Sequence, residues 1–506
     1  MTKNILSKYV LDLKYSKVGV TISKEPEQFV PKYSLNIPQL EPATLAFLED
    51  IRDKLIEKIP IKLESMKELE SFNELKSEIL KEAKEMIKKG LPEVSEAAAD
   101  FSALFVANEM IGLGNIEFLL EDENLEEIVI NSSKEPIWVY HKDLGWLKTN
   151  VYVDDENQIK NYSSIIGRRV GRQITMLNPL MDAHLWTGDR VNATLFPVST
   201  QGNTITIRKF RKKPWTITDF IKNNTINKET AAFLWLCMQY ELSVIIAGGT
   251  ASGKTSLLNT ILPFIPPNQR IVSIEETREL NLPKFLHWIP TVVREPNPEG
   301  KGEVTMLDLL VNSLRMRPDR IIVGEVRRQP EAEVLFEALN TGHSVYSTLH
   351  ANTAEEAFRR LTSPPINLPP DLIRSLPLFT IMFRQRRKNI RRLFEVVEVI
   401  PDEKISLRRL FSWKSRKDKI EKDNASKRVV EDMEIFTGMS KEEILKDIAE
   451  KEKILQWMVD NNITTVNTVG KVISEYYSDK KELLKNIKSP QGKKKILERY
   501  AAELGD

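Results

Sequence analysis

The sequence predicts an α/β fold built on a mostly parallel sheet, with further domains before and after it. Between residues 229 and 400, short apolar runs alternate with helix-like runs, and this alternation is typical of βαβ units. The runs expected to form strands are SVIIAGG, RIVSIEE, RIIVGEV and HSVYSTLHA. Helices are expected between them, among others at residues 306–315 and 331–339.

Composition limits the class of protein. A chain of 506 residues is too long for one core, so about three or four domains are expected. With 41% hydrophobic and 29% charged residues the chain is expected to be globular. Its net charge of +2 excludes a global basic field for nucleic acid.

Targeting and redox signals favour the cytoplasm. The amino terminus lacks the apolar core of a signal peptide, and no run approaches the ~18 apolar residues of a membrane span. Any contact with a membrane is therefore expected to be peripheral. The one cysteine, Cys237, lies in an apolar run and is interpreted as a core residue, in keeping with a reducing compartment.

The residues before the phosphate-binding core divide into two regions. Residues 1–98 are expected to be mostly helical, because apolar residues recur at helical spacing around Leu48 and again around Ile79. Residues 99–211 are expected to form an α+β domain of short strands, such as EEIVINSS and NTITIRKF. Two arginines of this domain, Arg190 and Arg208, lie within strand-like segments. Residues 212–228 combine charge, a proline and turn residues, and are interpreted as a linker.

The last region, residues 401–506, is expected to be helical. Ser440 followed by Glu443 forms a capping-box pattern at the start of one helix. A strongly basic stretch spans residues 384–419, which is either merely exposed or, in the interpretation that we favour, an interaction surface for an anionic membrane or an acidic partner. The arginines at 168, 169 and 172 form another dense cluster, for which a solvated face and an anion-binding surface stay equally open.

The clearest chemical motif follows the first strand of the core. The pattern G-x-x-x-x-G-K-[ST] begins at Gly248, and its glycines allow backbone N–H groups to surround a phosphate. Lys254 is expected to reach the terminal phosphates and Thr255 to hold Mg²⁺. The residues predicted to bind ATP are Gly248, Gly249, Thr250, Ala251, Ser252, Gly253, Lys254, Thr255 and Ser256.

Acidic residues follow two further strands. Three carboxylates, among them Glu279, come after IVSI, and Glu325 follows RIIVG. Glu325 is placed as an acidic strand end that coordinates Mg²⁺ through water. His343 and His350 lie at opposite ends of the next strand, too far apart to share zinc. One of these histidines is expected to sense the γ-phosphate.

Together these motifs resemble a known family. The order GGTASGKTS, IVSIEETREL, RIIVGEVR and TGHSVYSTLHAN, preceded by GDRVN and TIRKF, is similar to that of the ATPases of type II and type IV secretion systems. The archaeal branch, with the archaellum motor and pilus-assembly ATPases, is the most similar. The resemblance covers about residues 115–400. One position departs from it, because the acidic box usually has Glu-Asp where this chain has Glu275-Glu276.

The resemblance implies a fold and a mechanism. It implies a RecA-like ATPase domain after a PAS-like α+β domain, in a hexameric ring. Glu279 matches the residue that orients the attacking water, and Glu325 matches the Walker B glutamate. Arg190 and Arg208 match arginines that close on the γ-phosphate, which makes domain closure part of catalysis.

Two functions follow from these observations. The leading hypothesis is a Mg-dependent ATPase that drives filament assembly or secretion from the cytoplasm by acting on a polytopic membrane platform protein. The alternative is a RecA-like DNA translocase or helicase that would track nucleic acid with its basic cluster. Near-neutral net charge and the lack of an evident stacking platform argue against the alternative.

Overall fold

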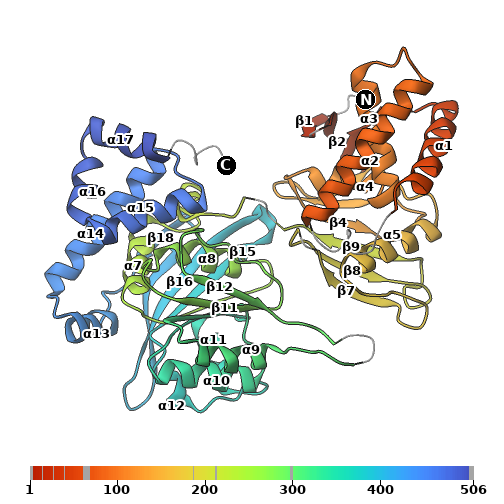
Figure 1. Cartoon of the computed structure of the whole chain (residues 1–506). Coiled ribbons are helices and arrows are strands. Elements are labelled where there is room, and N and C mark those ends of the chain that lie inside the picture. The colour runs from red at the N-terminus through yellow and green to blue at the C-terminus, as the bar shows by residue number, and fades with distance from the viewer. Residues whose placement is uncertain are drawn as a thin grey trace. The chain divides into compact units, whose positions relative to one another are not determined.

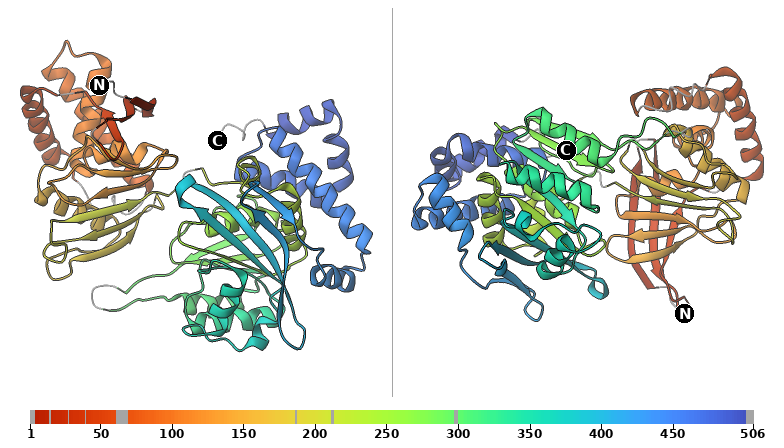
Figure 2. Two further views of the ribbon diagram at one scale, coloured as in Figure 1. Left: turned by 180° about the vertical axis from the view of Figure 1, so that it is seen from behind. Right: turned by 90° about the horizontal axis from the view of Figure 1, so that it is seen from below.

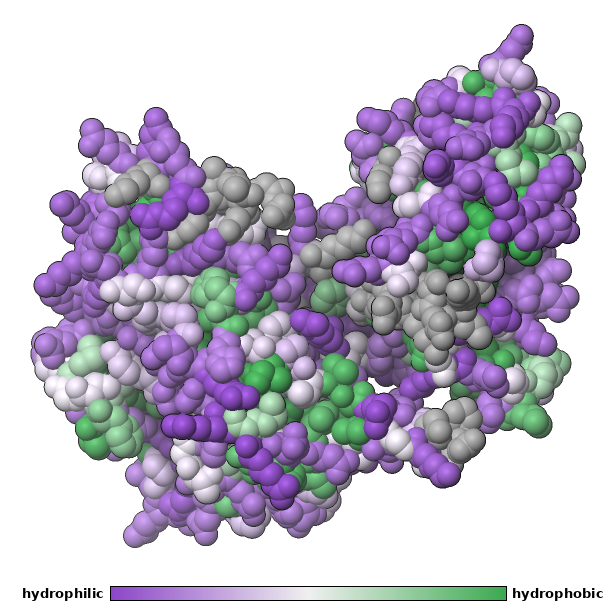
Figure 3. All heavy atoms as spheres, in the orientation of Figure 1, coloured by the Kyte–Doolittle hydropathy of each residue, from purple (hydrophilic) through white to green (hydrophobic). Residues whose placement is uncertain are grey.

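The computed structural model describes residues 4–500 except 14, 27, 39, 61–68, 186, 211–212 and 297–299. The chain divides into two compact units, Met1–Lys212 (unit 1) and Lys213–Asp506 (unit 2), each built around one large sheet (Figure 1). The predicted boundary at 211–212 lies outside the described residues. Hydrophilic side chains cover most of the face shown in Figure 3.

Unit 1 is an α/β unit with a sheet in the order β1-β2-β3-β6-β5-β4-β9-β8-β7. Its strands are β1 (Asn4–Leu13), β2 (Ser16–Lys24), β3 (Lys32–Asn36), β4 (Leu125–Ile130), β5 (Trp138–His141), β6 (Gly145–Thr149), β7 (Leu180–His184), β8 (Arg190–Thr194) and β9 (Thr204–Arg208). Its helices are α1 (Pro42–Lys58), α2 (Leu69–Gly90), α3 (Glu96–Ile111), α4 (Ile116–Glu121) and α5 (Glu156–Arg169).

The prediction of a separate, mostly helical segment at residues 1–98 is wrong in part. Helices α1 and α2 are present as expected, but the strands β1, β2 and β3 precede them. In β2, alternate residues are buried at Val18, Val20 and Ile22, which is the period of a strand with one face on a core. Strand β3 pairs with β6, so this segment completes the sheet of unit 1.

Unit 2 has a sheet in the order β12-β11-β13-β14-β10-β15-β16-β17-β18. The pairs among the first six strands of this order are parallel, and β16, β17 and β18 add to the edge in antiparallel fashion. The strands are β10 (Val244–Gly248), β11 (Ile271–Glu275), β12 (Trp288–Val292), β13 (Arg320–Val323), β14 (Ser344–Leu349), β15 (Leu378–Gln385), β16 (Ile390–Ile400), β17 (Ser406–Lys414) and β18 (Lys419–Lys422). The predicted α/β fold with a mostly parallel sheet is confirmed.

Helices cover both faces of this sheet (Figure 2). They are α6 (Ile217–Lys222), α7 (Lys228–Gln239), α8 (Lys254–Ile261), α9 (Met306–Ser313), α10 (Gln329–Asn340), α11 (Ala354–Thr362), α12 (Pro370–Ile373), α13 (Arg428–Thr437), α14 (Lys441–Asp460), α15 (Val466–Ser478), α16 (Lys480–Asn486) and α17 (Pro490–Tyr500). Short 3-10 helices are η2 (Leu262–Phe264), η3 (Leu314–Met316) and η4 (Arg386–Lys388). None of the helices in the described part of the chain is long and apolar enough to span a membrane.

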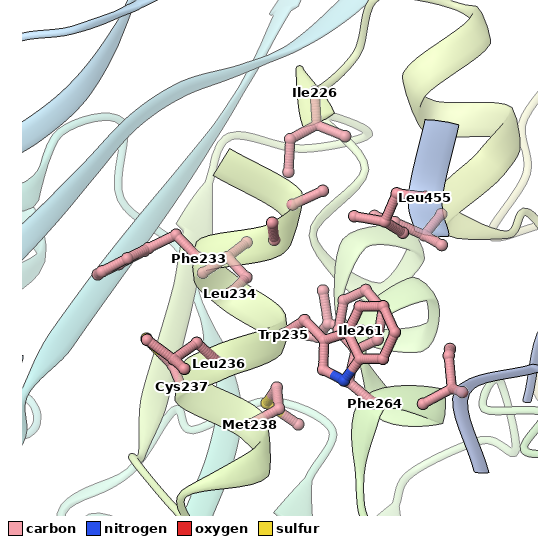
Figure 4. Close-up of a cluster of buried hydrophobic side chains, with 14 of the residues drawn as sticks. Ile226, Phe233, Leu234, Trp235, Leu236, Cys237, Met238, Ile261, Phe264 and Leu455 are labelled. Atoms are coloured by element: carbon pink, nitrogen blue, oxygen red, sulfur yellow. The ribbon is translucent and has the colours of Figure 1, made fainter. Parts of the chain in front are cut away.

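The two faces explain the apolar sequence of β10. Val244 and Ile246 belong to a core with α7, α8 and the C-terminal helices, whereas Ile245 and Ala247 belong to a core with α9, α10 and α11. In the first core Trp235 stacks on Phe264 with ring centroids 5.2 Å apart (Figure 4). Cys237 is buried there as predicted, and burial raises the pKa of its thiol.

The prediction of a helical region at residues 401–506 is wrong for its first part. Strands β17 and β18 extend the sheet to Lys422, and the helices begin only with α13. In β17 the consecutive basic residues Arg408 and Arg409 are exposed and the next four residues, Leu410 to Trp413, are buried, so this strand lacks the alternation that a strand prediction uses. The capping box of Ser440 and Glu443 is present at the start of α14.

Helix α6 fastens the start of unit 2 to its far end. Thr218 Oγ1 donates a hydrogen bond to the carbonyl oxygen of Ile463 at 2.6 Å, and Lys222 Nζ donates to Asn462 Oδ1 at 2.6 Å. Both acceptors lie between α14 and α15. The predicted linker at 212–228 therefore includes a helix that packs on the C-terminal helices.

A buried carboxylate joins the N-terminal strands to the rest of unit 1. Asp122 Oδ2 accepts hydrogen bonds from the hydroxyls of Tyr9 at 2.5 Å and Tyr33 at 2.8 Å. Its Oδ1 accepts from the backbone N–H of Asn124 at 2.9 Å. Asp122 is fully buried, so water would not replace these hydrogen bonds if the carboxylate were removed.

We expect Asp122→Ala to destabilise unit 1 by about 2–4 kcal/mol, because the buried phenol group of Tyr33 and the partly buried one of Tyr9 lose their acceptor. Hydrogen exchange of β2 and β3 in the full chain measures this as lost amide protection. Asp12→Ala is the control, since Asp12 and its partner Lys17 are both largely exposed. Equal protection in the two variants would contradict the role of Asp122.

Candidate nucleotide-binding site

The loop after β10 has the shape that phosphate binding requires. All five residues of β10 are buried, and the chain then turns through Ala251 and Gly253, whose φ angles are 57° and 97°. A Cβ on Gly248 would lie 2.6 Å from the carbonyl oxygen of Met382, so this position has no room for a side chain. Helix α8 begins at Lys254 and directs its first N–H groups toward the loop.

The polar groups of the loop fit an anion. Lys254 Nζ donates to the carbonyl oxygen of Gly249 at 3.2 Å, which holds the ammonium group over the loop. Ser252 Oγ is buried and has no hydrogen-bond partner within the described part of the chain. A cradle closed to side chains, with an ammonium group above it and an unsatisfied hydroxyl inside it, suits a nucleotide phosphate.

Acidic residues lie at the same edge of the sheet. Because β10, β14, β13 and β11 are parallel neighbours, the residues after their carboxyl ends come together. Glu325 follows β13 and Glu276 follows β11. Glu279 lies three residues further along the loop after β11 and is exposed.

An arginine that the sequence reading missed joins two of these acids. Arg327 Nη1 donates to both oxygens of Glu276 at 2.7 and 2.9 Å, while its Nη2 and Nε donate to Glu325 Oε2 at 2.8 and 3.1 Å. This contact gives Glu276 a defined partner. The only sequence signal was the arginine two residues after Glu325 in VGEVR.

Glu275 shapes the loop that carries Glu279. Its Oε1 accepts hydrogen bonds from the backbone N–H groups of Glu279 at 2.8 Å and Leu280 at 3.0 Å. Its Oε2 is buried and has no hydrogen-bond partner within the described structure. Burial raises the pKa of this carboxyl to about 7, against the opposing effect of the two N–H groups.

The two histidines lie at opposite ends of strand β14. His350 follows β14, and its pKa is lowered first by burial and then by the nearby charge of Lys254. His343 precedes β14, where its Nδ1 lies 3.2 Å from the carbonyl oxygen of Ala338. A six-residue strand separates them by about 20 Å. The structure therefore brings His350 to the loop and does not bring His343 there.

The two arginines predicted in unit 1 face each other. Arg190 on β8 and Arg208 on β9 are directly opposite in the strand register, and both are exposed. Like charges at such positions repel, so the pair suits an anion. In this structure Asp182 accepts from Arg190 at 3.0 and 2.6 Å, and this contact lowers the pKa of the Asp182 carboxyl.

The cluster at residues 168, 169 and 172 is partly structural. Arg169 is buried, donates to the carbonyl oxygen of Ile111 at 2.6 Å, and lies over the ring of Phe72 at 4.9 Å from its centroid. Arg172 donates to the carbonyl oxygen of Asp182. These contacts account for two of the three arginines without a ligand.

Comparison with known proteins adds a family. Residues 179–466 match the family described as "Type II/IV secretion system protein". A protein of Methanocaldococcus jannaschii that carries no functional name is 38% identical over 379 residues, which are 73% of this chain and 68% of that protein. The type IV secretion system protein VirB11 of Bartonella henselae is 28% identical over 340 residues, 59% of this chain and 94% of its own.

Among solved structures, the Legionella pneumophila ATPase DotB has a TM-score of 0.40 and 22% identity, and the match covers 71% of this chain and 94% of DotB. A TM-score of this size supports no inference about the site.

We expect Glu275→Gln to remove a pH dependence of stability. The carboxyl pKa is about 7 in the folded chain against an ordinary 4.5, so the folded state holds the proton over that interval and the unfolded state does not. Stability should therefore fall as pH rises from about 4.5 to about 7, by up to about 3 kcal/mol.

Urea unfolding at pH 5 and pH 8 measures this difference. The midpoint of wild type should fall more between the two values than that of Glu275→Gln, while Glu276→Gln, at an exposed neighbouring carboxylate, keeps the wild-type change. Identical changes in all three proteins would contradict the protonation of Glu275.

Proposed function

Because the chain belongs to the type II/IV secretion system protein family, we propose that it hydrolyses ATP with Mg²⁺ and uses the energy to drive secretion or the assembly of a pilus-like filament. The observation that carries this proposal is the meeting of the phosphate loop with Glu325 and Glu279 at one edge of the sheet. Phosphoryl transfer requires a cradle, a metal, an oriented water and positive charge.

We assign these parts as follows. Lys254 and the N–H groups at the start of α8 bind the β- and γ-phosphates. Thr255 and Glu325 would hold Mg²⁺, which would neutralise charge on the phosphates. Glu279 orients the attacking water, and Glu275 sets the turn that presents it.

His350 senses the γ-phosphate. Its lowered pKa keeps the ring neutral at pH 7, so one ring nitrogen can donate to a phosphate oxygen without a permanent charge. We assign no role to His343, because it lies at the other end of β14 from the phosphate loop.

We further propose that Arg190 and Arg208 bind the γ-phosphate when unit 1 closes on a nucleotide held by unit 2. Support comes from their facing positions on β8 and β9. Arginines in this role contribute about 10³ to 10⁵ in rate. Arg190 would have to leave Asp182 for the phosphate, which makes this ion pair a resting contact.

The finer function concerns partners. We propose a homohexameric ring that works in the cytoplasm on a polytopic membrane platform protein. The basic hairpin of β15, η4 and β16 suits an anionic membrane surface, because Arg387 and Lys388 are exposed at its turn. Archaellum assembly and pilus assembly are both consistent with this scheme, and co-purification with a membrane protein would identify the system.

We expect Lys254→Ala to lower kcat/KM for ATP by at least about 100-fold, because the phosphates lose their ammonium partner. Glu325→Gln should bind ATP but turn over slowly, since it weakens the metal site. Phosphate release measures both. Lys446→Ala, at an exposed position on α14, should behave as wild type. ATP turnover that survives Lys254→Ala would contradict the proposed activity.

We expect Arg190→Ala to retain ATP binding and to lose about 10³ in kcat, because transition-state charge loses a partner. Asp182→Ala is the matched control: it breaks the same ion pair but keeps Arg190, so turnover should persist. An equal loss in both variants would assign the effect to the fold of β7 and β8. Undiminished turnover with Arg190 and Arg208 both replaced by alanine would contradict closure.

A further inference from the structure

A second cationic side chain lies beside the phosphate loop. Arg391, near the start of β16, donates a hydrogen bond from Nε to the carbonyl oxygen of Ala251 at 3.1 Å. Its Cδ lies 3.7 Å from the position that a Cβ on Gly253 would occupy. The guanidinium group therefore contacts the loop immediately before the N-terminus of α8.

The strand that carries Arg391 is firmly held. The next residue, Arg392, is buried and pairs with Asp418 through two hydrogen bonds of 2.8 Å each. The backbone N–H of Leu393 donates to the carbonyl oxygen of Thr225 at 2.8 Å. Arg391 thus extends from a fixed backbone, as residues that position ligands usually do.

The position of β16 in the sheet places Arg391 on the opposite side of β10 from the acidic residues. Glu279, Glu325 and His350 follow β11, β13 and β14, which all lie on one side of β10. Arg391 comes from the other side, where β15 and β16 extend the sheet. If the terminal phosphate of a bound nucleotide points toward Glu279 and Glu325, its other phosphates lie nearer to Arg391.

We propose that Arg391 binds the diphosphate part of the nucleotide, which ATP and ADP share. The inference rests on the proposed ATP binding. A guanidinium group presents five N–H donors, so a bond to the loop carbonyl through Nε is compatible with a second contact to phosphate oxygen. A contact that is equally strong in the ground state and in the transition state affects KM and leaves kcat unchanged.

The test uses the full chain with Arg391→Ala, Arg391→Lys and the control Arg315→Ala, which replaces an exposed arginine of η3. Titration with fluorescent ADP and with a fluorescent non-hydrolysable ATP analogue measures affinity, and phosphate release measures kcat and KM. Arg391→Ala should weaken both ligands about tenfold and raise KM similarly, with kcat within about twofold of wild type. Arg391→Lys should lie between the two, and Arg315→Ala should equal wild type.

Several outcomes overturn the inference. Unchanged affinities in Arg391→Ala would exclude the contact. A fall in kcat at unchanged affinity would place Arg391 in the chemical step, and an equal loss in Arg315→Ala would indicate a general effect of charge. If wild type itself binds neither nucleotide, the proposed function fails. If wild type binds and Lys254→Ala does not, while Arg391→Ala binds normally, only the present inference fails.

Discussion

The parallel alignment of four strands is the constraint on which the site depends. Residues that follow β10, β11, β13 and β14 meet at one edge because these strands run the same way. Parallel strands must be covered on both faces, which the two cores of unit 2 provide. Because β10 is buried on both faces, packing holds the phosphate loop at its carboxyl end in a defined position relative to Glu325 and His350.

Charge balance is the second requirement of this edge. Glu276 and Glu325 are brought close by neighbouring strands, and Arg327 lies between them. A metal ion that approached Glu325 would compete with Arg327 for the same carboxylate oxygen. Glu275 adds little negative charge below pH 7, because burial raises the pKa of its carboxyl to about 7. The acidic edge therefore carries less negative charge than its sequence suggests.

Local patterns predicted the core of unit 2, and distant contacts explain what they missed. Strand β10, the phosphate loop and α8 are consecutive, so one segment contains their whole pattern. Strand β3 pairs with β6, which is far away in sequence, and no local window reveals that pairing. Strands β1, β2 and β17 pair with sequence neighbours, and their charged residues hide the strand pattern. Arg327 contacts Glu276 across 51 residues and Arg391 contacts Ala251 across 140, so neither pairing can be inferred from the local sequence. His343 and His350 are close in sequence, but they lie at opposite ends of β14, so only His350 is near the phosphate loop.

The attachment of α6 has a mechanical meaning. This helix follows directly on the boundary between the units, and it is bonded to the loop between α14 and α15. The chain just after it supplies the carbonyl of Thr225 to β16, whose Arg391 is bonded to the phosphate loop. A displacement of the chain where it enters unit 2 would therefore act both on the C-terminal helices and on the phosphate loop, because these hydrogen bonds connect the entry segment to both.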